Sequence, residues 1–285
     1  MTALEKLKEL ASVFERAGIE DAAREAALLI TETIGINKAT LHARPPDIDD
    51  AASKVIDAFA KRRVQGEPIQ YIIGHVDFYG LRIHVGKGVL IPRPETELLV
   101  EETVNLIKRS GEMVSRQIGL SVLDLCTGSG CIALSIAKSF LQANVYGIDT
   151  SAMALEYAKL NAEYNGIRNV TFIEGNLFSP LDSGVCLDFI VSNPPYIRRA
   201  DIPRLQKEIV HEPIEALDGG EDGLDFYKTI LKEAFCYLKK NGRVILEVGF
   251  DQAEDIRRLA VSQGFKNIRF VKDYASIDRI FVGSF

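Results

Sequence analysis

The sequence predicts an α/β fold in which a doubly wound, mainly parallel sheet follows a small N-terminal helical domain, with a β-hairpin joining the two. From residue 120 onward, short apolar segments alternate with helical segments, which is typical of a parallel sheet covered by helices. A glycine-rich loop connects the first of these strands to the next helix, and polar residues directly follow several strands. We therefore expect a helical bundle over residues 1–70, a hairpin linker over residues 71–91 and an α/β domain over residues 92–285.

The N-terminal segment has the apolar periodicity of packed helices. Four apolar residues recur on one face of the first helix: Leu4, Leu7, Leu10 and Phe14. Two further helices are expected over residues 21–34 and 51–63, the second capped by Asp49 or Asp50. A bundle of about 70 residues buries a small core, so we expect its stability to depend partly on contacts with the adjoining domain.

The next segment is expected to form the hairpin and the helix that leads into the sheet. Residues 71–89 alternate in polarity and contain glycines, which predicts a β-hairpin. Residues 92–97 then enter a helix whose body spans residues 98–108. Thr96 is the expected cap of this helix.

The remaining chain supplies the sheet and its covering helices. Parallel strands are expected over residues 121–125, 144–148, 170–174, 187–191 and 243–248. Helices are expected over residues 131–139, 152–164, 226–238 and 251–262. Residues 268–271 and 279–282 are joined by a loop too short for a crossover helix, so they should form an antiparallel hairpin at the end of the chain.

The loop after the first parallel strand has a glycine pattern suited to a nucleotide-like ligand. It comprises Cys126, Thr127, Gly128, Ser129 and Gly130. The two glycines allow the backbone to approach a ligand closely, and the following helix presents unpaired N–H groups at its N-terminus. Asp149 follows the second strand, where its carboxylate can accept hydrogen bonds from two ribose hydroxyls. This spacing fits an adenosine-containing cofactor.

The same glycine pattern also matches the turn that binds dinucleotides. Gly128, Gly130 and Ala133 have the required spacing, and an acid lies about twenty residues further on. A nicotinamide-dependent dehydrogenase is therefore an alternative. Asp124 inside the preceding strand argues against it, and so does the tetrapeptide that follows the fourth strand, because hydride transfer has no use for it.

That tetrapeptide is Asn193-Pro194-Pro195-Tyr196. Its prolines fix φ near about −65° and restrict the residue before each of them, so the turn is stiff. The Asn193 side chain and the Pro194 carbonyl offer two acceptors that could grip the hydrogens of a planar NH2 group, and Tyr196 could stack on that group. The alternative is a strand that simply ends in a proline-containing turn.

Three segments ahead of the sheet, together with the tetrapeptide, resemble the release-factor glutamine N5-methyltransferases of the PrmC/HemK type. The segments read GEPIQYIIG at residues 66–74, FYG at residues 78–80 and VLIPRPETE at residues 89–97. The tetrapeptide is shared with enzymes that methylate adenine or cytosine amines, whereas the third segment is far more particular. The resemblance spans nearly the whole chain and implies a class I, Rossmann-like methyltransferase domain.

The resemblance implies methyl transfer from S-adenosyl-L-methionine to a glutamine side-chain amide. The implied acceptor is the glutamine of the Gly-Gly-Gln motif in class 1 peptide-chain release factors, a modification that modulates translation termination. These release factors are then the protein partner, and residues 1–70 would recognise them. A packing role for the bundle is the alternative.

The resemblance also implies a set of site residues. The implied cofactor site comprises Cys126, Thr127, Gly128, Ser129, Gly130, Asp149, Asn176, Leu177 and Asn193. The implied substrate site comprises Asn193, Pro194, Pro195 and Tyr196, of which Asn193 and Pro194 are catalytic. Phe78, Arg93 and Glu97 are implied to close over the bound cofactor and exclude water.

The chain departs from the family pattern at two positions. Cys126 stands where glycine is common, so this backbone position must tolerate a Cβ. Asn176 stands where aspartate is common, and because an amide donates as well as accepts, recognition of the adenine amine falls to its oxygen.

Two alternatives share parts of this site. An adenine-N6 or cytosine-N4 methyltransferase would use the same tetrapeptide on a flipped base of RNA or DNA. A non-catalytic adaptor would bind the cofactor without chemistry, although the intact tetrapeptide argues against it. The formal net charge of −6 argues against a dedicated nucleic-acid binder, so no stable nucleic-acid partner is expected.

Composition is that of an ordinary soluble enzyme, with 47% hydrophobic and 26% charged residues in a chain of 285. The four cysteines show no paired spacing and the histidines are scattered, so neither a metal site nor a disulfide is expected. No apolar run approaches the roughly 20 residues of a membrane span, and the first ten residues do not read as a secretory leader. We therefore expect a cytoplasmic protein without a membrane partner.

Overall fold

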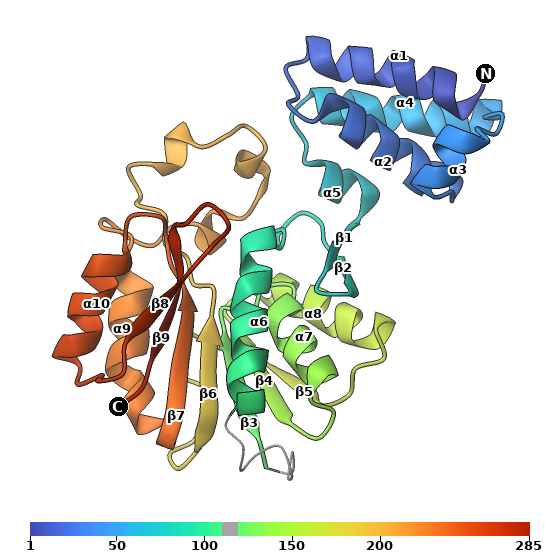
Figure 1. Cartoon of the computed structure of the whole chain (residues 1–285). Helices are drawn as coiled ribbons and strands as arrows, with labels where there is room; N and C mark the ends of the chain where they lie inside the picture. The colour runs from blue at the N-terminus through green and yellow to red at the C-terminus, as the bar shows by residue number, and fades with distance from the viewer. Residues whose placement is uncertain (110–118) are drawn as a thin grey trace. The chain divides into compact units, whose positions relative to one another are not determined.

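The computed structural model describes residues 1–109 and 119–285 (Figure 1). Within these residues the chain divides into two units. The first comprises Met1–His75 and Gln206–His211, and the second comprises Val76–Leu205 and Glu212–Phe285. The second unit contains the sheet and the cavity described below.

The first unit is a helical bundle. Its helices are α1 (Ala3–Arg16), α2 (Ala22–Ile34), α3 (Lys38–Ala43), α4 (Asp50–Val64) and α5 (Ile69–Ile73). Phe14, Leu29 and Ile56 are fully buried in its core. Asp49 caps α4 as predicted, because its Oδ1 accepts the N–H of Ala52 at 2.7 Å.

A buried arginine connects the bundle to the separate segment Gln206–His211. The guanidinium of Arg63 donates to Glu25 at 2.5 Å and to Glu208 at 3.0 Å. Arg63 is only 5% exposed, whereas the side chain of Glu208 is 36% exposed, so the contact with Glu208 is the more solvated of the two. The segment after the tetrapeptide is therefore packed as part of the bundle.

The hairpin is shorter than the sequence predicts. Its strands are β1 (His75–Phe78) and β2 (Leu81–His84), whereas residues 71–73, which were expected to be strand, complete helix α5. Gly74 ends this helix at φ 85°, and its N–H donates to the carbonyl of Gln70 at 2.8 Å. The apolar run before Gly74 is too short for its period to distinguish a helix from a strand.

The second unit is built on a seven-stranded sheet of order β5-β4-β3-β6-β7-β9-β8 (Figure 1). Its strands are β3 (Ser121–Leu125), β4 (Asn144–Asp149), β5 (Val170–Glu174), β6 (Leu187–Ser192), β7 (Leu238–Glu247), β8 (Arg269–Lys272) and β9 (Asp278–Gly283). The strands from β5 to β7 pair in parallel, and β9 runs antiparallel to both β7 and β8. This is the predicted doubly wound, mainly parallel sheet with a terminal antiparallel hairpin.

Helices cover both faces of this sheet: α6, α7 and α8 lie on one face, and α9 and α10 lie on the other (Figure 1). Their bounds are α6 (Pro94–Arg109), α7 (Cys131–Ser139), α8 (Ala152–Tyr164), α9 (Asp225–Glu233) and α10 (Ala253–Ser262). Short 3-10 turns occur at Ile202–Arg204, Ile209–His211, Ile214–Ala216 and Ala234–Cys236. Among the described residues, no helix has both the length and the apolar character needed to cross a membrane.

Strand β7 begins earlier than predicted, at Leu238 instead of residue 243. Leu238 pairs with Leu187, and the pairing then shifts so that Arg243 lies opposite Phe189. The intervening residues 239–242 form an irregularity on the edge of the ladder. Their polar composition, Lys-Lys-Asn-Gly, resembles a turn and conceals the start of the strand.

Strands β3 and β6 mark the point where the strand order reverses. The chain leaves β3 toward β4 on one side and leaves β6 toward β7 on the other. All six residues of β6 are buried, as expected for a central parallel strand. The hydroxyl of Ser192 donates to the carbonyl of Leu125 at 2.6 Å and fixes the carboxyl ends of the two strands side by side. Sheets of this kind bind ligands at such a switch point.

Candidate functional site

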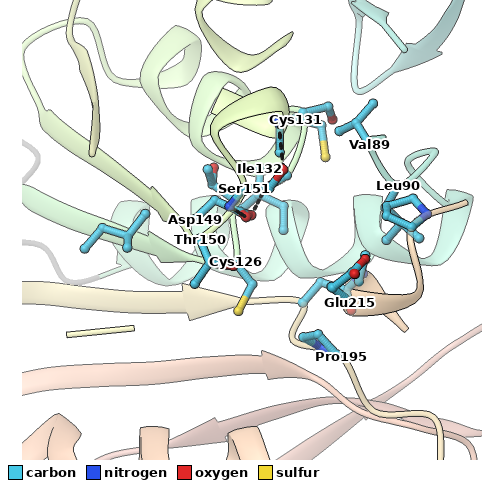
Figure 2. A pocket seen from close by; sticks show the side chains of 18 of the residues that line it. Val89, Leu90, Cys126, Cys131, Ile132, Asp149, Thr150, Ser151, Pro195 and Glu215 are labelled. Atoms are coloured by element: carbon cyan, nitrogen blue, oxygen red, sulfur yellow. Dashed lines mark hydrogen bonds between the residues drawn. The ribbon is translucent and has the colours of Figure 1, made fainter. Parts of the chain in front are cut away.

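A cavity of about 460 Å³ lies at the carboxyl ends of β3, β4, β5 and β6 (Figure 2). Its volume is within the range of small-molecule sites. The residues predicted from the sequence that line it are Cys126, Thr127, Gly128, Ser129, Asp149, Asn176, Leu177, Asn193 and Pro195. Three other predicted residues, Gly130, Pro194 and Tyr196, are not among its lining residues in the described part of the chain.

The glycine loop turns sharply between β3 and α7. Cys126, Gly128 and Gly130 all have positive φ, at 57°, 55° and 79°. Glycine adopts this backbone region readily, whereas a residue with a Cβ is strained there. Cys126 therefore occupies a position that favours glycine, which gives a physical meaning to its departure from the family pattern. Its thiol is held in the protonated form, because burial raises the pKa well above its usual range.

Asp124 supports the loop from below. Its Oδ2 accepts the hydroxyl of Thr127 at 2.6 Å and the N–H of Ala133 at 3.1 Å. The side chain is fully buried, and burial raises its pKa to about 7. Asp124 does not line the cavity, so its role is to hold the loop that does.

Asp149 ends β4 and lines the cavity directly. Its Oδ2 accepts the N–H of Gly128 at 2.8 Å and its Oδ1 accepts the N–H of Ser151 at 2.9 Å. Burial raises the pKa of this carboxyl, and the backbone N–H groups of Ser151, Gly128 and Thr150 oppose that shift. A carboxylate oxygen can accept more than one hydrogen bond, so both oxygens can still accept from a vicinal diol such as a ribose.

The wall beyond β5 is formed by Gly175, Asn176 and Leu177. Leu177 is buried and has a positive φ of 49°, which is a strained backbone conformation for a residue with a Cβ. Asn176 is exposed and presents an amide that can both donate and accept. An apolar side chain beside an amide suits the flat face and polar edge of a purine.

The tetrapeptide begins directly after β6, so its stiff turn stands at the switch point of the sheet. Asn193 is half-buried and lines the cavity, and its Nδ2 donates to Thr96 Oγ1 at 3.1 Å. No described residue donates to its Oδ1. The arrangement leaves an amide oxygen available as an acceptor in the cavity.

Tyr196 is turned toward the interior of the second unit. Its hydroxyl donates to Glu247 Oε1 at 3.3 Å, and burial raises its pKa well above its usual range. The sequence predicted that this ring could stack on a planar substrate group. In the structure, its hydroxyl is bound to a buried carboxylate at the end of β7, and stacking of the ring on a substrate stays a prediction.

The three residues expected to close over a cofactor do not line the cavity. Phe78 is 2% exposed and packs in the core, Arg93 pairs with Glu212 at 2.5 Å, and Glu97 accepts the N–H of Tyr79 at 2.8 Å. The expected cap at Thr96 is also wrong, since α6 begins at Pro94 and the Thr96 hydroxyl donates to Glu247 at 2.7 Å. These side chains pack against or bind residues elsewhere in the fold, and the local sequence does not indicate those contacts.

Several lining residues were not predicted. They include Gly88, Val89, Leu90 and Pro92 ahead of α6, Thr96 in its first turn, Met153 and Ala154 in α8, and Pro213, Glu215, Ala216 and Phe226 after the tetrapeptide. Figure 2 shows Leu90, Pro195 and Glu215 gathered on the side of the cavity away from Asp149. The prolines at positions 92 and 213 were the available signal, but nothing local indicates that their segments meet.

Two profiles of known families match the chain. Residues 5–74 match the PrmC N-terminal domain and residues 116–269 match a methyltransferase domain. The release factor glutamine methyltransferase of Thermodesulfovibrio yellowstonii is 42% identical over 283 residues, covering 99% of this chain and 98% of the relative. The protein of the same description from Agrobacterium fabrum is 40% identical over 270 residues, covering 93% and 91%.

Solved structures of methyltransferases share the fold. The hMettl16 catalytic domain in complex with MAT2A 3′UTR hairpin 1 is 14% identical, with a TM-score of 0.59 over 91% of this chain and 90% of that chain. A methyltransferase from Pyrococcus furiosus is 21% identical, with a TM-score of 0.50 over 72% of this chain and 88% of that chain. At these identities, the likeness concerns the fold alone.

Proposed function

The chain belongs to the release factor glutamine methyltransferase family, and from this premise we propose that it methylates the N5 side-chain amide of a glutamine in a peptide-chain release factor. The methyl donor of this family is S-adenosyl-L-methionine. We assign the acceptor to the glutamine of the Gly-Gly-Gln motif in class 1 release factors, so the reaction would modulate translation termination. Because release factors act on the ribosome, a cytoplasmic location fits this substrate.

The observation that carries the proposal is the position of Asn193. This residue lines the same cavity as the glycine loop and Asp149. A nucleotide-type cofactor and a planar NH2 group can therefore be held in one enclosed volume, which methyl transfer between them requires.

The cavity residues fit S-adenosyl-L-methionine by their chemistry. Asp149 can accept from the ribose hydroxyls, the backbone of Gly128 and Ser129 can approach the cofactor closely, and Leu177 with Asn176 can hold the adenine. When bound, this cofactor supplies a methyl group that its sulfonium makes electrophilic. The residues of the cavity would hold it in line with the acceptor and exclude water.

Asn193 and Pro194 are proposed to prepare the acceptor nitrogen. An amide nitrogen is a poor nucleophile because its lone pair is delocalised into the carbonyl. The Asn193 Oδ1 and the Pro194 carbonyl would accept its two N–H groups, orient the lone pair toward the methyl group and stabilise the positive charge that develops. No base is needed before attack, since the alkylated nitrogen becomes acidic and releases its proton afterwards.

The N-terminal bundle is proposed to recognise the release-factor protein. It corresponds to the segment that matches the PrmC N-terminal domain, residues 5–74. The boundaries proposed from the sequence, residues 1–70 for recognition, 71–91 for the linker and 92–285 for catalysis, assign binding and chemistry to different parts of the chain.

The direct test is methylation of purified class 1 release factor by the full chain with S-adenosyl-L-methionine. Mass spectrometry of the tryptic peptide containing Gly-Gly-Gln should show one added methyl group on the glutamine. Labelled methyl transfer to total RNA and DNA, measured in parallel, should stay at background. Label in nucleic acid with none in the release factor would refute the proposal.

A further inference from the structure

A chain of hydrogen bonds runs from the tetrapeptide to a carboxylate in the interior of the second unit. Asn193 Nδ2 donates to Thr96 Oγ1 at 3.1 Å, and Thr96 Oγ1 donates to Glu247 Oε2 at 2.7 Å. Thr96 and Glu247 are each only 1% exposed, so water does not compete for these groups. The three residues come from the end of β6, the first turn of α6 and the end of β7.

The direction of this chain is fixed by the number of protons available. A carboxylate only accepts hydrogen bonds, and a threonine hydroxyl has a single proton to give. Because that proton goes to Glu247, the Thr96 oxygen can only accept from Asn193. The amide of Asn193 must then turn its NH2 to Thr96 and its oxygen away from it.

Glu247 is held in place by several further groups. Its Oε1 accepts the hydroxyl of Tyr196 at 3.3 Å, and its backbone carbonyl accepts the hydroxyl of Tyr227 at 2.9 Å. Burial raises the pKa of Glu247 to about 6, while Thr96, Arg279 and Tyr196 lower it. The carboxyl is therefore ionised, and can only accept, near pH 8.

We propose that Glu247 and Thr96 are positioning residues that orient the Asn193 amide so that its oxygen faces the substrate. This inference rests on the proposed function, in which that oxygen accepts an N–H of the substrate amide. Neither residue has to touch the substrate or the cofactor's reacting group. An Asn193 amide turned the other way would present an NH2 to another NH2, which repels it.

The test compares Thr96→Val with Thr96→Ser in the full chain at pH 8. Valine removes the hydroxyl, so we expect kcat for release-factor methylation to fall about five- to ten-fold, the equivalent of one lost hydrogen bond. Serine keeps the hydroxyl and should restore kcat to within about two-fold. The cofactor Kd, measured by calorimetry, should change less than about two-fold in both variants. The same calorimetric titration shows whether each variant is folded, because an unfolded variant would not bind the cofactor.

A double-mutant cycle separates positioning from a general structural effect. In an Asn193→Ala background, Thr96→Val should cause no further loss of kcat, because the amide that it orients is gone. If Thr96→Val leaves kcat unchanged, or lowers it equally in both backgrounds, the inference is overturned. Should Thr96→Val fail to fold, Thr96→Ala is used in the same cycle. An inactive wild-type chain would instead refute the proposed function itself.

Discussion

At the scale of single residues, substitution of Asn193 tests the proposed chemistry most directly. We expect Asn193→Ala to lower the rate of methyl transfer about 10²- to 10³-fold, because it removes one preorganised acceptor from the transition state. The measurement is a single-turnover reaction with saturating cofactor, which isolates the chemical step from cofactor binding. A rate equal to that of the wild type would remove Asn193 from the mechanism.

Asp124 provides a prediction about stability and pH. Its pKa is about 7 in the folded chain and 3.8 in the unfolded one, so the folded state binds more protons between these values. The contribution of Asp124 to stability is therefore fully present below about pH 4 and is lost as the pH rises through about 7. Asp124→Asn has no such titration.

We expect the difference in free energy of unfolding between the wild type and Asp124→Asn to change by about 2 kcal/mol from pH 5.5 to 8.5, in favour of the variant at high pH. Urea unfolding of both proteins at several pH values measures it. Other titrating groups cancel in the difference, since both proteins contain them. Curves that stay parallel across this range would show that Asp124 does not titrate there.

At the scale of elements, the sequence predicted the parts of the fold whose signals are local. Strand β6 is a mainly apolar segment, interrupted by Asp188 and followed by Asn193 and two prolines. Helices α7 and α8 begin and end where their patterns do. Helix α5 was missed because a segment of five residues is too short to show a helical or strand period. The start of β7 was missed because its first residues are polar and pair irregularly with β6.

The same distinction applies to the candidate site. The glycine loop and Asp149 were predictable because each directly follows a recognisable strand. The contact between Thr96 and Glu247 joins residues 151 positions apart, and only the folded sheet brings them together. The one local signal for Glu247 was its place as an acidic residue directly after the apolar residues 244–246.

Asn161 in helix α8 connects that helix to strand β2 and to the glycine loop, so its substitution tests how these elements support the site. Its Oδ1 accepts the N–H of His84 in β2 at 2.6 Å. Its Nδ2 donates to the carbonyls of His84 at 3.1 Å and of Ser129 in the glycine loop at 3.0 Å. We expect Asn161→Asp, which loses both donated bonds, to weaken cofactor binding about ten-fold or more.

The matched control is Asn165→Asp. Asn165 follows α8 and donates to the carbonyl of Arg82 in the hairpin at 2.9 Å, but it does not reach the glycine loop. Its variant should change the cofactor Kd by less than about two-fold in the same calorimetric titration. Equal losses in the two variants would show that the hairpin, and not the loop, governs cofactor binding.

At the scale of the whole molecule, the first unit is completed by a distant part of the sequence. Glu208 lies 145 positions after Arg63, yet the two form an ion pair within the same unit. Residues 206–211 lie between the tetrapeptide and α9, far from the bundle in sequence. Nothing in their own sequence indicates that they pack with it. Sequence periodicity cannot reveal such a return of the chain, because the contact is non-local.

Arg63 forms an ion pair with this returning segment, and its removal should loosen the first unit. The side chain of Arg63 is 6% exposed, whereas those of its partners Glu25 and Glu208 are 18% and 36% exposed. Arg63→Met keeps much of the volume but leaves two neighbouring carboxylates without their cation, so we expect a loss of about 2–4 kcal/mol in local stability. Glu208→Gln removes only the more exposed partner and should cost about 1 kcal/mol or less. Amide hydrogen exchange in α2, α4 and residues 206–211 measures both effects on the full chain. Equal protection in the two variants would mean that the pair with Glu25 adds nothing to local stability.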